Sequence, residues 1–152
     1  MSDVSAQEVG PKFQDYKVDC VFAGPNHGLD VSAQSDDIWG EYRRSAIKRK
    51  VNFAGHYIIF TGGCGGGAIC GEILDAMTGR VVAGFPNAYE LDSADGGYYD
   101  AEYHPDSRLL EISGKAANSE RDRFGKVLLA KNRIRYFEFL GERLVLVSTK
   151  GN

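Results

Sequence analysis

Two cysteines flank a glycine-rich stretch at residues 62–71, which reads GGCGGGAICG. Cys64 and Cys70 lie six residues apart, with three consecutive glycines between them. Because glycine lets the backbone bend tightly, the two Cα atoms can approach the roughly 5.5 Å that a disulfide needs. The spacing therefore predicts a Cys64–Cys70 disulfide closing a small loop, while pairing of Cys20 with either cysteine stays open.

A reactive thiol is the second interpretation of the same stretch. A cysteine nucleophile needs a nearby base and a lowered pKa, and here His56 or His104 can supply the base. Asp100 or Asp106 can orient that histidine. A Cys-dependent enzyme that uses Cys64 with His56 is therefore an alternative hypothesis, and an oxidised Cys64 would exclude it.

Nucleotide and metal sites fit this stretch less well. A phosphate-binding loop places Gly-Lys-Ser/Thr at the start of a helix, whereas these glycines lead into an apolar run typical of a strand. The histidines and cysteines can furnish metal ligands, but a structural zinc site usually has two close Cys-x-x-Cys pairs, which are absent. The sequence therefore predicts no cofactor and no metal.

Acidic residues, glycines and tyrosines share the stretch ELDSADGGYYD at residues 90–100. The alternating ligand spacing of a calcium-binding EF-hand loop is missing. Tyrosines are good interface anchors, and carboxylates can meet a basic partner. We therefore predict a partner-binding loop, with a solvated hairpin loop and core tyrosines as the equal alternative. The predicted binding residues are Asp92, Asp95, Tyr98, Tyr99 and Asp100.

Length and composition bound the class of protein. The chain has 152 residues with 43% hydrophobic and 26% charged residues, which suits one globular domain at 13–152 after a polar, flexible arm at 1–12. A net charge of −3 disfavours nucleic acid and anionic membrane surfaces as partners. No apolar run is long enough to span a membrane. The arm also lacks an apolar signal core, so export requires a signal peptide that has already been removed.

One amphipathic helix is expected before residue 50. Its apolar face consists of Ile38, Trp39, Tyr42, Ala46 and Ile47, which recur at helical spacing. Ser35 or Asp36 is the expected N-cap. The run KRK at 48–50 lies where a helix dipole favours cations, so a solvated last turn is favoured over a phosphate-binding patch.

Strand patterns dominate the rest of the chain. In the clearest one, Ile134, Tyr136 and Glu138 alternate with Arg135, Phe137 and Phe139. Short turns join successive strands, which indicates an α+β fold, mainly an antiparallel β-sheet meander with the helix packed on it. The expected strands are 16–22, 56–61, 68–74, 80–83, 98–103, 108–113, 133–140 and 143–149, with 126–130 as a strand or a short helical turn.

Several motifs resemble a known family. NFAGHY at 52–57, GCG at 63–65 and ILDAMTGRV at 73–81 are similar to a family of small exported bacterial proteins with an NFAGHY…GCG…DAxTG core and no established activity. Family members often carry the second cysteine two residues after the position of Gly65, whereas here it is Cys70. The resemblance implies a β-rich fold and a periplasmic or extracellular location, and it transfers no catalytic residues.

A non-enzymatic extracytoplasmic binding protein is the function that these features favour. Its most concrete form is an inhibitor or immunity protein that neutralises a toxic effector enzyme, such as a cell-wall hydrolase. The expected partner is therefore a protein. A purely structural envelope protein is a further alternative, and it would have no soluble partner.

Overall fold

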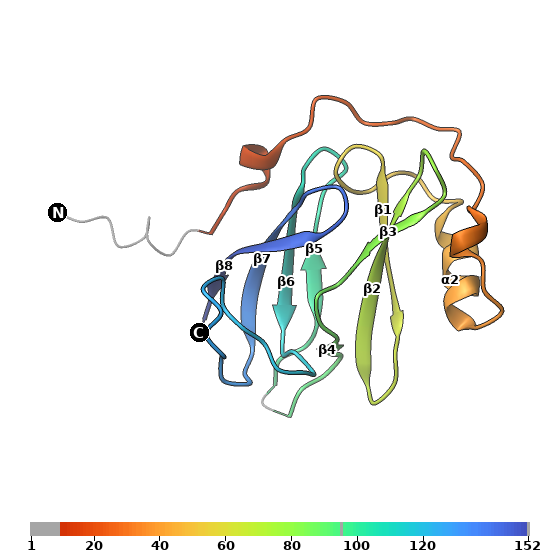
Figure 1. Cartoon of the computed structure of the whole chain (residues 1–152). Coiled ribbons are helices and arrows are strands. Elements are labelled where there is room, and N and C mark those ends of the chain that lie inside the picture. The colour runs from red at the N-terminus through yellow and green to blue at the C-terminus, as the bar shows by residue number, and fades with distance from the viewer. Residues whose placement is uncertain (1–9, 95, 152) are drawn as a thin grey trace.

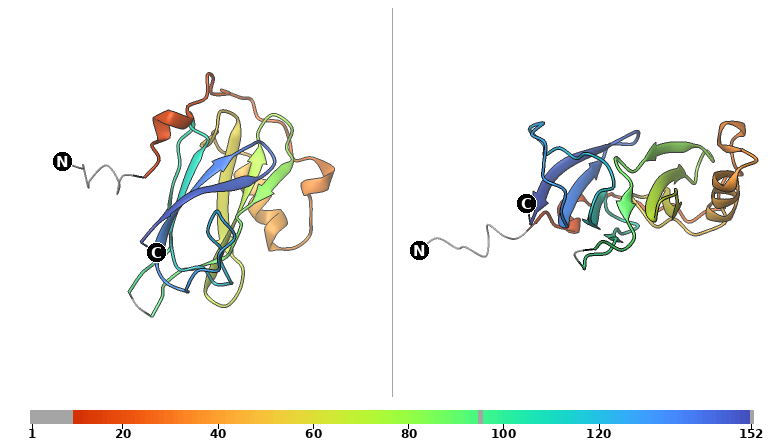
Figure 2. Two further views of the ribbon diagram at one scale, coloured as in Figure 1. Left: turned by 60° about the vertical axis from the view of Figure 1, so that its left-hand side comes forward. Right: turned by 90° about the horizontal axis from the view of Figure 1, so that it is seen from below.

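A computed structural model describes residues 10–94 and 96–151, so Asp95 and residues 1–9 of the predicted arm lie outside the described residues. The chain forms three layers, in which one helix covers the first of two antiparallel sheets and the second sheet packs on the other face (Figure 1; Figure 2, right). The α+β fold with a dominant antiparallel sheet and one packed helix is therefore confirmed. In the described part of the chain, no helix is long and apolar enough to cross a membrane.

The first sheet is built on a long hairpin. Its strands are β1 (Tyr57–Gly63), β2 (Ala68–Asp75), β3 (Val81–Gly84) and the short β4 (Tyr89–Glu90). The order is β1-β2-β3, and β4 pairs with the start of β2. The turn between β2 and β3 uses Gly79 at a φ of +75°, a conformation that side chains strongly disfavour.

The second sheet is a simple meander. Its strands are β5 (Asp100–Glu102), β6 (Leu109–Gly114), β7 (Arg133–Phe139) and β8 (Leu144–Lys150), in the order β5-β6-β7-β8. The predicted meander is thus divided into two sheets. This division buries one face of each sheet against the other.

The main core lies between the two sheets. Ile59 and Ile73 pair across β1 and β2 and point toward the second sheet, where Leu110, Ile112 and Phe137 meet them. All five side chains are buried. Strand alternation explains the arrangement, because every second residue of each strand faces the opposite sheet.

The helix α2 (Ile38–Ala46) covers the other face of the first sheet. Arg43 of this helix holds the carboxylate of Glu72 on β2 through two hydrogen bonds of 2.8 Å. Asp37 is the N-cap, since its side chain accepts from the Gly40 N–H. The expected cap at Ser35 or Asp36 was therefore wrong: Ser35 instead donates its hydroxyl to the Asp37 carboxylate.

Residues 10–37, the described segment before α2, contain no strand. A 3₁₀ turn, η1 (Phe13–Tyr16), is followed by an extended stretch at 17–30, here called the strap, and by a second 3₁₀ turn, η2 (Val31–Ala33). The strap's N–H groups at Phe22, His27 and Asp30 donate to turn carbonyls at Gly55, Ala76 and Gly79. The expected strand at 16–22 does not form, because its ladder pairing is limited to one bridge between Lys17 and Ser107, and Phe22 bonds a turn instead.

The expectation for 126–130 also needs correction. This stretch is neither a strand nor a helical turn, and its only ladder contact among the described residues is a bridge between Arg121 and Val127. At the other end of the chain, Gly10, within the predicted arm at 1–12, packs against Tyr136. A Cβ atom there would come within 2.4 Å of the tyrosine ring.

Candidate protein-binding surface

Four loops gather at one end of the two sheets, at the lower edge of Figure 1. They are the β1–β2 tip at 64–67 and the loops at 85–88, 91–99 and 115–132, and together they are called the loop end. Each loop follows or precedes a core strand, so the sheets fix where the loops start and finish.

The conformation of the β1–β2 tip explains why residues 62–71 are rich in glycine. Cys64 and Cys70 form a disulfide with their Cα atoms 5.7 Å apart, as predicted. Gly65, Gly66 and Gly67 all have positive φ angles, of +99°, +63° and +76°. Residues with a side chain rarely adopt that conformation even once, so three successive glycines are needed to turn the tip.

Backbone hydrogen bonds tie the loops to one another. The Leu91 N–H donates to the Gly67 carbonyl at 2.9 Å, which joins the disulfide-closed tip to the next loop. The Ala117 N–H donates to the Ala88 carbonyl at 2.8 Å. Asn87 strengthens the second connection, because its side chain bonds the backbone at 118 and 119. The loops of the loop end are therefore connected to one another by hydrogen bonds.

The predicted binding loop is itself a small hairpin. Asp92 bridges to Tyr98, and the Ser93 hydroxyl donates to the Gly97 carbonyl at 3.0 Å. The side-chain amide of Asn132 donates to the Ser93 oxygen at 3.3 Å, which docks the hairpin on the base of β7. Loop 91–99 is thus shaped by internal bonds before any partner binds.

The structure divides the predicted binding residues between surface and core. Asp92, Tyr98 and Asp100 are exposed, and Tyr98 exposes 69% of its surface. Tyr99 instead packs on the core and stacks on Tyr89 with ring centroids 6.2 Å apart, and burial raises the pKa of its phenol. Tyr98 and Asp100 also line a hollow of about 600 Å³ beside β7 and β8.

The loop end carries five exposed large apolar side chains, while others, such as Val31 and Leu140, lie elsewhere on the surface. Leu91 exposes 53% of its surface, Phe124 81% and Leu129 82%. Val127 is also exposed, and Tyr98 completes the set. Val127 and Leu129 were not predicted as surface residues because 126–130 was expected to be a strand or a short helical turn, and Phe124 was assigned to no element. Their apolar type beside charged neighbours, in a segment with no clean strand or helix period, was the available signal.

A buried charge cluster anchors loop 115–132. Arg135 has no exposed side-chain surface, yet it lies on the same face of β7 as Phe137. Glu120 from the loop pairs with both Arg135 and Arg133, and the Arg135 guanidinium lies over the Tyr89 ring at 4.9 Å. This ion cluster pins the middle of a long irregular loop onto the second sheet.

The alternative pair of Cys64 and His56 is not assembled. His56 precedes β1 and Cys64 follows it, so eight residues of extended chain separate them by roughly 25 Å. The Cys64 sulfur is also committed to the disulfide. His56 instead bonds Asp75 at 2.7 Å, and the Asp75 carboxylate in addition accepts from the Met77 N–H. This Asp75–His56 pair therefore braces the turn that follows β2.

The remaining features of the chain concern possible metal ligands, the third cysteine and the comparison with known proteins. Among residues 10–94 and 96–151, no group of three or more His, Cys, Asp or Glu side chains is placed to hold a metal ion. Cys20 is a free thiol at the surface. No known protein family, no curated protein and no solved structure matches the chain.

Proposed function

We propose that the protein is a non-enzymatic extracytoplasmic binding protein whose loop end engages a partner protein. The observation that carries the proposal is the loop end itself, where exposed Leu91, Tyr98 and Phe124 stand on loops already joined by a disulfide and hydrogen bonds. Large exposed apolar side chains gathered on one surface are typical of protein-binding sites.

Preorganisation favours an inhibitor over a flexible adaptor. Association costs free energy for every side chain and loop that must be ordered, so loops that are already fixed lose less on binding. Here the tip 64–67 is closed by a disulfide, the hairpin 91–99 by its own bonds, and the loop 115–132 by Glu120. The most concrete form of the proposal is an inhibitor or immunity protein that neutralises a toxic effector enzyme such as a cell-wall hydrolase.

The proposed location is the periplasm or the extracellular space. Disulfides form and persist in oxidising compartments and are rare in the cytosol. The Cys64–Cys70 bridge supports this location, as does the resemblance of the NFAGHY…GCG core to small exported bacterial proteins.

The test is inhibition of an enzyme encoded beside this gene. Candidate hydrolases and toxins from neighbouring genes are assayed with and without the purified protein, and binding is measured by biolayer interferometry. We expect Tyr98→Ala and Phe124→Ala to weaken binding at least tenfold each, as hot-spot aromatics do. Met77→Ala is the control, because Met77 is an exposed apolar residue, with 52% of its surface exposed, in the turn at the opposite end of β2.

Two results would contradict the proposal. If no enzyme encoded by a neighbouring gene binds the protein, the result favours the alternative of a structural envelope protein. If binding occurs but Met77→Ala weakens it more than Tyr98→Ala, the loop end is the wrong surface.

A further inference from the structure

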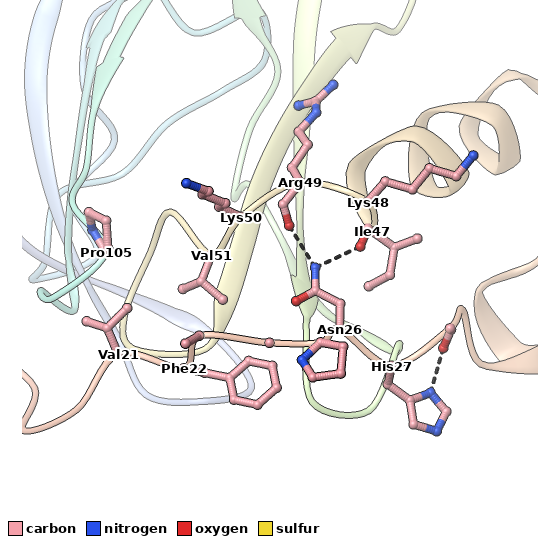
Figure 3. Close-up of a pocket in the computed structure, with 14 residues that line it drawn as sticks. Val21, Phe22, Asn26, His27, Ile47, Lys48, Arg49, Lys50, Val51 and Pro105 are labelled. Carbon is pink, nitrogen blue, oxygen red and sulfur yellow. Dashed lines mark hydrogen bonds between the residues drawn. The ribbon is translucent and has the colours of Figure 1, made fainter.

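A second hollow lies at the opposite end of the molecule, under the strap. It encloses about 870 Å³ between residues 21–28 of the strap, residues 47–51 after α2, and Pro105 (Figure 3). It is called the strap hollow here. It shares no residue with the loop end, because the two lie at opposite ends of the strands.

The floor of the strap hollow is apolar. Phe22, Ile47 and Val51 belong to or pack on the core beneath α2, while Val21 leaves 46% of its surface exposed at the mouth. Exposed Pro105 extends the apolar wall. An apolar body placed here would therefore rest on a floor that is continuous with the hydrophobic core.

The rim of the hollow is basic. Lys48, Arg49 and Lys50 all line the hollow and are exposed, and Figure 3 shows their charged ends spread apart and directed outward from the strap. No Asp or Glu is among the described residues that line the hollow. None of the three cations pairs with a carboxylate of the described chain, whereas Arg43, Arg108, Arg133 and Arg135 all do. An acidic protein thus leaves three adjacent lining residues of one apolar hollow without a carboxylate partner among the described residues.

Capping of α2 does not require these cations as hydrogen-bond donors. The Asn26 side-chain amide donates to the Ile47 carbonyl at 2.8 Å and to the Arg49 carbonyl at 2.7 Å. The N–H groups of residues 47–49 bond carbonyls of the last helical turn, and the strap bonds the carbonyls just beyond it. The long side chains of Lys48 and Lys50 are free to lay their methylene stems along the hollow and keep their charges at its rim.

We propose that the strap hollow binds a small amphipathic anion, with a hydrocarbon body on the floor and a carboxylate or similar head at the basic rim. Its volume lies within the range of about 300–1,000 Å³ that is usual for small-molecule sites. The ligand is a small molecule and not the protein partner of the loop end. The inference thus goes beyond the proposed function and does not depend on it.

Dodecanoate, kept below its micelle concentration, is the probe. In a ¹⁵N-labelled sample, we expect saturable shifts of the backbone amides at 21–28 and 47–51, with no shifts in the loop end. Binding should raise the midpoint of thermal unfolding, since a ligand of the folded state stabilises it. Added salt should weaken binding, because the head group meets exposed charges.

Charge variants identify the rim. Lys48→Gln/Lys50→Gln should weaken dodecanoate binding by about tenfold, as the loss of two exposed ion pairs allows. Lys126→Gln/Lys131→Gln, with two lysines removed from the loop end, should bind as the parent does. Val21→Ser should also weaken binding by removing apolar contact at the mouth.

Three outcomes would overturn the proposal. Neutral dodecyl maltoside should bind more weakly than dodecanoate, and equal binding would show that the charge plays no part. Shifts confined to other residues would move the site elsewhere. Sedimentation with phosphatidylglycerol vesicles without any binding of monomeric dodecanoate would assign the basic rim to a membrane surface instead.

Discussion

Replacing Glu120 by glutamine tests whether the buried charge cluster anchors the loop end. Glu120 accepts a 2.6 Å hydrogen bond from Arg133 and two more from nitrogens of the Arg135 guanidinium. The Arg135 side chain is completely buried, and the Glu120 side chain is 12% exposed. In Glu120→Gln the two guanidinium charges stay in place, but the carboxylate that neutralises them is lost.

The expected loss of stability is large for a single substitution. Removing one partner of a buried ion pair costs about 3–5 kcal/mol, because the remaining charge is left uncompensated. Glu120 keeps some contact with solvent, so we expect about 3 kcal/mol, near the lower limit of that range. For a domain of this size, that loss lowers the unfolding midpoint by roughly 6–12 °C. Urea unfolding followed by the fluorescence of Trp39, the single tryptophan, measures it directly.

Two further variants make the test specific. Glu142→Gln removes an exposed carboxylate from the β7–β8 turn and should change stability by less than about 0.5 kcal/mol. In Glu120→Gln/Arg135→Met, the fully buried charge is removed as well, so part of the lost stability should return. A stability loss below about 1 kcal/mol in Glu120→Gln would refute the reasoning, because a solvated surface ion pair contributes only that much to stability.

Three more predictions follow from single sites. Cys64→Ser/Cys70→Ser should cost about 2 kcal/mol in urea unfolding, because the closed loop is short, and an unchanged midpoint would count against the disulfide. Gly79→Ala should cost about 2–4 kcal/mol and raise hydrogen exchange in the strap, because a Cβ there meets the Gly28 carbonyl oxygen at 1.9 Å and φ is positive; normal exchange would contradict this. Desolvation, then the Glu102 charge, raises the pKa of Glu111 above its ordinary 4.5, so the ionised carboxylate costs stability as pH rises through that raised pKa. Glu111→Gln should therefore stabilise the protein at pH 7 by less than about 1 kcal/mol, with the gain vanishing below pH 4.5, whereas a gain that persists in acid would exclude this cause.

Local features of the fold were predictable from sequence. The β1–β2 hairpin and its disulfide follow from an apolar strand, a run of glycines and two cysteines at a spacing that allows closure. In β7, alternation correctly placed Arg135 with Phe137 and Phe139 on one face. These features depend only on residues near one another in the chain.

Features that depend on distant residues were not predictable. Alternation puts Arg135 on the core face but does not name Glu120, fifteen residues earlier in an irregular loop, as the group that neutralises it. Strand β4 pairs with the start of β2 and also bridges Ala116 after β6, and no local pattern encodes either contact. Alternation also means that only one of Tyr98 and Tyr99 can face the surface, and contact with Tyr89 decides that it is Tyr98.

The two proposed sites lie far enough apart to act independently. Strands of about seven residues separate the loop end from the strap hollow, which corresponds to roughly 23 Å. Effects of substitutions at sites more than about 10 Å apart, with no shared partner, usually add. Tyr98→Ala should therefore leave dodecanoate binding unchanged, and Lys48→Gln/Lys50→Gln should leave binding of the protein partner unchanged. If dodecanoate alters the affinity for the partner, the two sites are coupled through the first sheet, and the strap hollow regulates the loop end.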